Sequence, residues 1–145
     1  SSEVGALDVS SEALNVVKEN SEALGIEVET LQMDVLNWTE LDRKFDIVVS
    51  NPPYVLESDK EEIHKNVLDY EPHIALFVED SDPIIFYERI ADFALHHLNP
   101  HGKIYFEIHE KYGLEVVECL RKRNFQDIRI VKDINGKDRI VAATL

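Results

Sequence analysis

Apolar residues along this chain gather in short runs and in longer stretches with helical spacing, and the two patterns alternate. The short runs are rich in Val, Ile and Phe and are bounded by polar, Gly or Pro residues, which is typical of buried strands. Strands are therefore predicted for Val4–Asp8, Val28–Met33, Phe45–Ser50, Lys103–Ile108, Ile128–Val131 and Ile140–Leu145. Helices are predicted for Ser11–Leu24, Ile84–Leu98 and Leu114–Lys122.

The residues between these segments support the same assignment. Ser10-Ser11-Glu12 suits the start of a helix, and Gly25 suits its end. Asn135-Gly136, between the last two predicted strands, is a strong hairpin signal. Strands that alternate with helices favour an α/β fold with a mostly parallel sheet, and the hairpin adds one antiparallel strand at the edge. The polar stretch from Ser50 to about Asp82 predicts loop or weak helix.

Composition and charge narrow the class of protein. The 145 residues are 44% hydrophobic and 30% charged, as expected for one globular domain. The net charge of −14 disfavours a nucleic-acid substrate, because phosphate binding depends on Lys and Arg. The single cysteine, Cys119, excludes an internal disulfide framework and is expected to be a buried core thiol. Neither a membrane-spanning stretch nor a signal-peptide pattern is present, so we expect a cytoplasmic location and no membrane partner.

The most informative motif is Asn51-Pro52-Pro53-Tyr54, which directly follows a predicted buried strand. Ligands of open α/β sheets bind at the carboxyl ends of strands, so this motif is expected to face a site. The prolines make the segment stiff and remove backbone donors. The Asn51 side-chain oxygen and the Pro52 carbonyl can together accept both hydrogens of a planar NH₂ group, with Tyr54 as an aromatic wall. The alternative is an ordinary Pro-Pro turn.

Two aspartates end consecutive predicted strands and form the second candidate feature. Asp8 is placed as in dinucleotide-binding folds, where an acid at a strand end bonds ribose hydroxyls. Asp34 can accept from an adenine amino group, while Val9 and Val35 can pack on the faces of the ring. Taken alone, either aspartate is better explained as a strand-end cap or a solvated charge, and the pair gains weight only together with the motif after Ser50.

Taken together, these motifs resemble those of the class I S-adenosylmethionine-dependent methyltransferases, and among them the HemK/PrmC glutamine methyltransferases of peptide chain release factors. The resemblance covers nearly the whole chain. The Asn-Pro-Pro-Tyr motif is shared with methyltransferases that act on amino groups of DNA, RNA and protein, and Tyr70-Glu71-Pro72 points to the release-factor branch. The residues that carry the resemblance are Asp46 to Val55, Tyr70-Glu71-Pro72, Ala75-Leu76, Gly102 to Glu107, Asp8 and Asp34.

The resemblance implies a Rossmann-like sheet, S-adenosylmethionine as cofactor and a release factor as protein partner. It implies catalytic roles for Asn51, Pro52 and Tyr54, and substrate binding by these residues together with Pro53. The implied cofactor-binding residues are Asp8, Val9, Asp34, Val35 and Asn51. The chain departs from the family at Ile108 to Gly113, where His109 stands in place of a glycine that most relatives carry.

The family's first strand, glycine-rich loop and N-terminal helical domain have no counterpart here, so residues 1–145 are expected to be the C-terminal part of a catalytic domain, inactive on its own. In this fold the first strand lies between the strands that end at Asp8 and Ser50, and its loss leaves two open edges. We expect these edges to pair directly, to exchange an element with a second copy, or to retain a separate piece. Methylation of a nucleic-acid base amine and a silent binding module are the alternative functions.

No metal site is predicted from the six histidines, whose spacing suits no ligand set. His97 and His101 are four residues apart, but Pro100 breaks the helix that would align them. His96 and His97 are expected at a helix C-terminus, where the helix dipole favours them.

Overall fold

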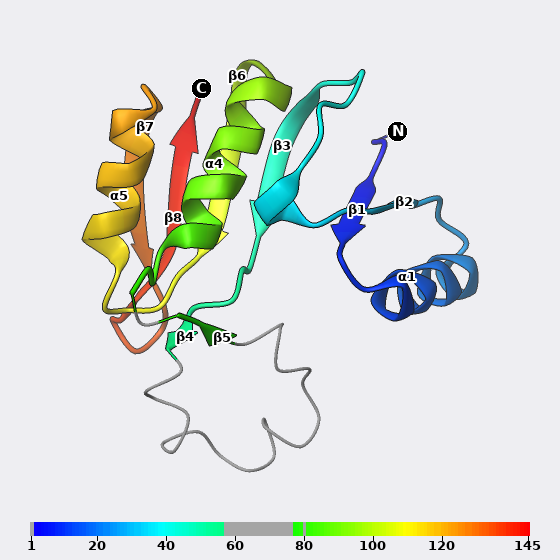
Figure 1. Cartoon of the computed structure of the whole chain (residues 1–145), viewed down its shortest axis with the longest axis horizontal. Helices are drawn as coiled ribbons and strands as arrows, with labels where there is room; N and C mark the ends of the chain where they lie inside the picture. Colours follow the sequence, from blue (N-terminus) through cyan, green and yellow to red (C-terminus); the bar gives the residue numbers. More distant parts are fainter. Residues whose placement is uncertain (1, 57–76, 80) are drawn as a thin grey trace. The chain divides into compact units, whose positions relative to one another are not determined.

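The fold is described from a computed structural model of the chain, which places residues 2–56, 77–79 and 81–145. The chain divides into two compact units, Ser1–Thr39 and Glu40–Leu145, and each is described by itself. No helix within the described ranges is long and apolar enough to cross a membrane. Figure 1 shows the elements of both units.

The first unit is a strand–helix–strand arrangement. It consists of β1 (Gly5–Asp8), α1 (Ser11–Leu24), β2 (Glu29–Gln32) and a short 3₁₀ helix, η1 (Val35–Asn37). β1 and β2 are parallel, and Asp8 pairs with Gln32 at their carboxyl ends. The Ser10 side chain caps α1 by accepting from the Ala13 N–H, and Gly25 ends the helix with a left-handed φ of 66°.

The second unit contains a four-stranded mixed sheet in the order β3-β6-β8-β7. β3 and β6 are parallel, whereas β8 is antiparallel to both β6 and β7. A separate parallel pair, β4 with β5, follows the carboxyl end of β3 (Figure 1). The elements are β3 (Phe45–Ser50), β4 (Val55–Leu56), β5 (Phe77–Val78), α4 (Ile85–His97), β6 (Leu98–Glu107), α5 (Gly113–Lys122), β7 (Gln126–Lys132) and β8 (Asp138–Thr144).

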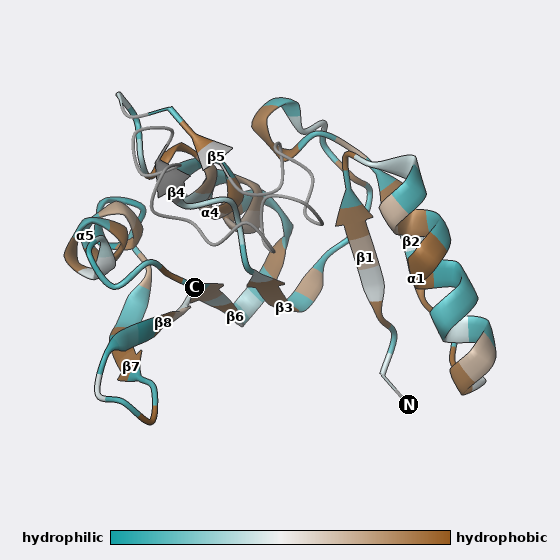
Figure 2. Cartoon of the chain, turned by 90° about the horizontal axis from the view of Figure 1, so that it is seen from below, coloured by the Kyte–Doolittle hydropathy of each residue, from teal (hydrophilic) through white to brown (hydrophobic). Residues whose placement is uncertain are grey.

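Helices α4 and α5 pack on the same face of the sheet (Figures 1 and 2). Ile104 and Phe106 of β6 and Val141 of β8 are fully buried beneath them. Arg123, at the end of α5, joins the two helices by donating from Nε to Asp92 of α4 at 2.6 Å. The opposite face of the sheet carries no helix among the described residues of this unit. The core is therefore one layer of helices on one layer of sheet.

The predicted α/β class, the mostly parallel arrangement and the terminal hairpin are confirmed, and the bounds of α1 and β3 agree with those predicted. The antiparallel strand was wrongly predicted at the edge, because β8 lies between β6 and β7. The prediction for β6 was wrong at its start. The strand begins at Leu98, which pairs with Phe45, and the register then shifts so that Ile47 pairs with Lys103. The irregular stretch holds His101 with φ of 65°. It also holds Gly102, where a Cβ would lie 2.8 Å from the Asn99 carbonyl oxygen.

The two strands expected to have open edges each have one partner in the part of the chain that the structure describes. β1 pairs with β2, and β3 pairs with β6. Direct pairing of β1 with β3, exchange of an element with a second copy, and retention of a separate piece all stay predictions.

Candidate functional site

The Asn51–Tyr54 segment leaves the sheet where β3 ends. Ser50 is the last residue of β3 and pairs with Phe106, so the segment begins beside the carboxyl end of β6. The Asn51 side chain is exposed, whereas Pro52 is buried and Tyr54 is half-buried. A buried proline next to an exposed amide fixes the backbone and leaves the amide oxygen accessible. This arrangement fits a site that binds a planar NH₂ group by accepting its hydrogen bonds.

The environment of Tyr54 is built by the end of β6 and the segment after it. Burial raises the pKa of the Tyr54 hydroxyl above its ordinary value, and the Glu107 carboxylate raises it further by its charge and as a hydrogen-bond partner. The positive charge of Arg139 lowers this pKa and opposes part of the shift. The ring of Tyr54 meets that of His109 edge-on, with centroids 5.8 Å apart. The phenol is therefore protonated at neutral pH.

Glu107 was not identified as a site residue by sequence reasoning. Its carboxylate contacts Tyr54, and its backbone carbonyl accepts a 3.2 Å hydrogen bond from the hydroxyl of Tyr87 on α4. Tyr87 is fully buried, and burial raises its pKa. The sequence feature that could have identified Glu107 is its position at the carboxyl end of a predicted strand, because functional side chains of parallel sheets lie at these ends.

Asp8 and Asp34 lie at the carboxyl ends of β1 and β2 in the first unit, and both cap the backbone locally. Asp8 Oδ1 accepts from the Ser10 N–H at 2.8 Å. Asp34 Oδ1 accepts from the Leu36 N–H at 2.9 Å, and its Oδ2 accepts from Asn37 Nδ2 at 2.7 Å. The structure thus brings Asp8 and Asp34 to the same end of one unit, and it brings the Asn51–Tyr54 segment together with Glu107 in the other.

These caps leave room for a ligand with hydroxyl and amino donors. Each carboxylate oxygen offers two acceptor positions, so one capping bond does not exhaust it. Val9 is 45% exposed and Val35 is half-buried, which provides apolar surface beside each carboxylate. These two acceptors and the apolar surface beside them therefore fit the ribose and the adenine of a nucleoside.

His97 and Cys119, which the sequence analysis also named, are buried in the core. His97 is fully buried, with Nδ1 2.8 Å from the Phe93 carbonyl oxygen and Nε2 accepting from the Leu41 N–H at 3.0 Å. Cys119 is 3% exposed, as predicted, and burial raises the pKa of its thiol to about 11. No group of three His, Cys, Asp or Glu side chains that could hold a metal ion occurs in residues 2–56, 77–79 and 81–145. The Tyr70-Glu71-Pro72 and Ala75-Leu76 motifs lie outside the described residues.

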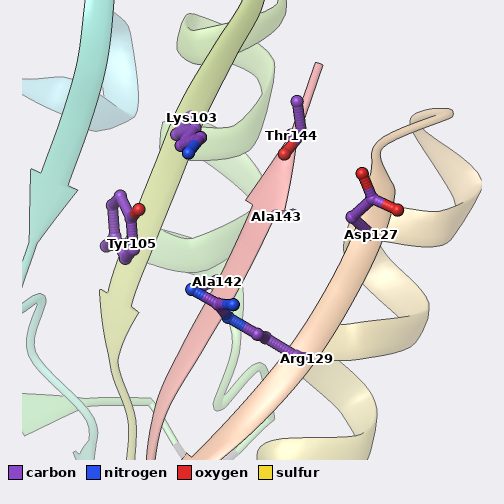
Figure 3. Close-up of a pocket in the computed structure, with 7 residues that line it drawn as sticks. All are labelled: Lys103, Tyr105, Asp127, Arg129, Ala142, Ala143 and Thr144. Atoms are coloured by element: carbon purple, nitrogen blue, oxygen red, sulfur yellow. The ribbon is translucent and has the colours of Figure 1, made fainter.

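A surface pocket of about 260 Å³ lies on the face of the four-stranded sheet opposite α4 and α5 (Figure 3). Side chains from β6, β7 and β8 project into it, and Arg129 reaches across β8. Tyr105 and Lys103, its lining residues on β6, lie two and four residues before Glu107, so the pocket extends from about 7 Å to about 13 Å along the strand from Glu107. Its lining residues are Lys103, Tyr105, Asp127, Arg129, Ala142, Ala143 and Thr144.

The arrangement of strands and helices is one that known methyltransferases share. Residues 1–72 match the methyltransferase small domain family. The fold is similar to the crystal structure of a methyltransferase from Pyrococcus furiosus, with a TM-score of 0.67 and 18% identity over 98% of this chain and 62% of that chain. These matches define the class of protein.

Two curated relatives narrow the class to one family. The chain is 46% identical to the release factor glutamine methyltransferase of Flavobacterium psychrophilum over 95% of this chain and 48% of the relative. It is 45% identical to that of Bacteroides thetaiotaomicron over 97% of this chain and 51% of the relative. Over nearly its whole length the chain is similar to release factor glutamine methyltransferases, and it spans about half the length of these relatives.

Proposed function

We propose that the protein to which this chain belongs methylates the side-chain amide nitrogen of a glutamine in a peptide chain release factor, with S-adenosylmethionine as methyl donor. The observation that carries this proposal is the Asn51–Tyr54 segment at the end of β3, with Asn51 exposed beside a buried Pro52. The names of the relatives support the choice of a glutamine amide over other NH₂ groups.

The chemistry that Asn51 and Pro52 perform is orientation of a weak nucleophile. The lone pair of an amide nitrogen is delocalised into the carbonyl group, so the nitrogen attacks poorly unless its electron density is raised. Asn51 Oδ1 and the Pro52 carbonyl accept the two N–H hydrogens of the glutamine amide, which points the lone pair at the methyl group. Tyr54 forms a wall against the plane of the amide, and Pro53 keeps the segment stiff. Positioning of the amide and electrostatic stabilisation of the transition state then account for the acceleration of methyl transfer.

The residues proposed to hold the cofactor come from the first unit and from Asn51. Asp8 accepts from the ribose hydroxyls and Asp34 from the adenine amino group, while Val9 and Val35 pack against the ring. S-adenosylmethionine supplies a methyl group activated by its positive sulfur. Asn51 is proposed to contact both ligands, as the family resemblance implies.

The charge of the chain supports a protein substrate. A net charge of −14 attracts a basic protein and repels a nucleic-acid backbone, so base methylation is the less favoured chemistry. A release factor acts at the ribosome, which places the proposed function in the cytoplasm. We also propose that residues 1–145 form part of a longer catalytic domain, since the relatives are about twice as long.

A label-transfer assay tests the function. The full-length gene product is incubated with methyl-labelled S-adenosylmethionine and a release factor, and in parallel with transfer RNA and with duplex DNA. We expect label in the release factor alone, and loss of that label with Asn51→Ala but not with the exposed control Asn20→Ala. Label in a nucleic acid would favour base methylation, and absence of label from all three acceptors would favour a silent binding module.

A further inference from the structure

The carboxyl ends of β3 and β6 leave the sheet side by side. The two strands are parallel and Ser50 pairs with Phe106, so Asn51 and Glu107 follow at the same level. Neighbouring strands lie about 4.8 Å apart. This spacing brings the Asn51–Tyr54 segment within side-chain reach of Glu107 and of the residues after it.

Two side chains from this neighbouring segment fix the ring of Tyr54. The Glu107 carboxylate lies close enough to the Tyr54 hydroxyl for its negative charge to raise the pKa of that hydroxyl, and it offers the hydroxyl an acceptor. The His109 ring meets the Tyr54 ring at an interplanar angle of 62°, with centroids 5.8 Å apart. An edge-to-face contact and a charge-assisted hydrogen bond both depend on direction, so together they select one orientation of the phenol.

His109 is itself held in place by the backbone and by a second aromatic ring. Its Nδ1 accepts a 3.1 Å hydrogen bond from the Lys111 N–H, which requires that Nδ1 carry no proton. The Tyr112 ring packs on the same imidazole, with centroids 5.7 Å apart. The edge that His109 presents to Tyr54 is therefore set by the turn at the start of α5.

The main chain at Glu107 is fixed from two directions. The Tyr87 hydroxyl on α4 donates to the Glu107 carbonyl at 3.2 Å, and Tyr87 packs edge-on against Phe106 with centroids 5.2 Å apart. On the other side, the Ile108 N–H donates to the Arg139 carbonyl at 2.9 Å. A carboxylate whose backbone is held by a helix and by a neighbouring strand is a rigid anchor.

We propose that Glu107 is a positioning residue of the methyl-transfer site. Its carboxylate accepts a hydrogen bond from the Tyr54 hydroxyl and so holds the Tyr54 ring beside Asn51 and Pro52. This inference rests on the proposed function, which gives Tyr54 the role of a wall against the substrate amide. Because the Tyr54 hydroxyl donates its hydrogen bond to Glu107, Tyr54 offers the glutamine its ring and no donor. A ring that is already ordered loses no further rotamer entropy when the substrate binds.

A double-mutant cycle in the full-length protein tests the path through Tyr54. We measure kcat and KM for the release factor with Glu107→Ala, with Tyr54→Phe and with both changes. Each single change is expected to lower kcat by about tenfold or more, because each removes a hydrogen bond to a charged group. The double variant is expected to be no worse than the poorer single variant, since both changes break the same contact.

Two variants separate positioning from folding. Glu107→Gln keeps the shape and an acceptor oxygen and is expected to restore most of the kcat lost in Glu107→Ala. Glu110→Gln changes an exposed carboxylate in the same connection, paired with Lys137 at 2.9 Å, and is expected to leave kcat unchanged. Binding of S-adenosylhomocysteine, followed by calorimetry, is expected to be the same in all variants.

A spectroscopic arm tests the contact without any activity. In protein with ¹³C at the tyrosine Cζ, the Tyr54 resonance is assigned by its loss in Tyr54→Phe and followed with pH. Glu107→Gln is expected to lower the pKa of Tyr54, because the negative charge that opposes ionisation is removed.

The outcomes distinguish this inference from the proposed function. An unchanged Tyr54 pKa in Glu107→Gln, or additive losses in the double variant, would overturn the role of Glu107 even if the parent methylates release factor. A parent that transfers no methyl group would overturn the proposed function, and the shift of the Tyr54 pKa would still report whether the contact exists.

Discussion

Asn51 is the residue on which the proposed chemistry depends most. Its side chain is exposed at the end of β3 and therefore contributes little to the core. Asn51→Ala is expected to lower kcat by about a hundredfold or more, as does loss of one oriented polar group in other active sites. The free energy of unfolding is expected to change by less than about 0.5 kcal/mol, as for most surface substitutions. Methyl-transfer kinetics and urea unfolding measure the two quantities, and parallel loss of both would contradict the role of Asn51.

Asp8 has a structural task that must be separated from cofactor binding. Its Oδ1 accepts from the Ser10 N–H, which shapes the turn between β1 and α1. Asp8→Asn keeps this acceptor and removes the charge, whereas Asp8→Ala removes both. If Asp8 binds the ribose hydroxyls, both variants weaken S-adenosylhomocysteine binding in calorimetry, by about tenfold. If Asp8 only caps the turn, Asp8→Asn binds like the parent protein.

Cys119 makes the stability of the second unit depend on pH. Burial raises the pKa of its thiol from 9.0 to about 11, so folding favours the protonated form. The resulting stabilisation is complete below pH 9.0 and is lost as the pH rises through about 11. Between about pH 8 and about pH 11, the free energy of unfolding of the parent, measured with urea, is expected to fall by on the order of 2 kcal/mol more than that of Cys119→Ala. Equal slopes in the two proteins would show that the thiol does not titrate on unfolding.

At the scale of elements, the start of β6 depends on a glycine. The strand enters through an irregular stretch in which a Cβ at Gly102 would lie 2.8 Å from the Asn99 carbonyl oxygen. Gly102→Ala is expected to destabilise the protein by about 1–3 kcal/mol, because the backbone must shift to admit the methyl group. Gly5→Ala, where the nearest heavy atom is 3.9 Å away, is the matched control and is expected to be neutral. Thermal unfolding compares the two, and equal melting temperatures would contradict this explanation.

The sequence predicted those elements whose signals are local. α1 has a Ser cap, a helical apolar face and a terminal glycine, and β3 is a β-branched run that stops at two prolines, so both have their predicted bounds. The start of β6 was missed because it depends on pairing of Leu98 with Phe45, more than 50 residues away. The Asn51–Tyr54 segment was identified from its composition. Glu107 was missed because its role comes from the register between β3 and β6, which no local pattern contains.

At the scale of the whole molecule, β3 forms an edge of the four-stranded sheet and exposes large apolar residues. Ile47 is 56% exposed and Val49 is 73% exposed. Edge strands with apolar side chains pair with other chains. We therefore expect the 145-residue chain to self-associate through this edge in sedimentation velocity, as proposed from the sequence.

Val49→Lys is expected to shift the chain towards monomer, because a charged side chain disfavours edge pairing. Leu24→Lys is the matched control, since Leu24 on α1 is also 73% exposed and belongs to the first unit. Equal effects of the two substitutions would show that self-association reflects general hydrophobicity. A monomeric parent would contradict the edge-pairing prediction itself.

The central claim concerns where the methyl group goes, and tandem mass spectrometry of the modified substrate tests it most directly. A release factor is incubated with the full-length gene product and S-adenosylmethionine, then digested and fragmented. The proposed function predicts the added mass of one methyl group on the side chain of one glutamine, absent when Asn51→Ala replaces the parent. A methyl group on any other residue type, or an unmodified release factor beside a methylated nucleic acid, would contradict the account.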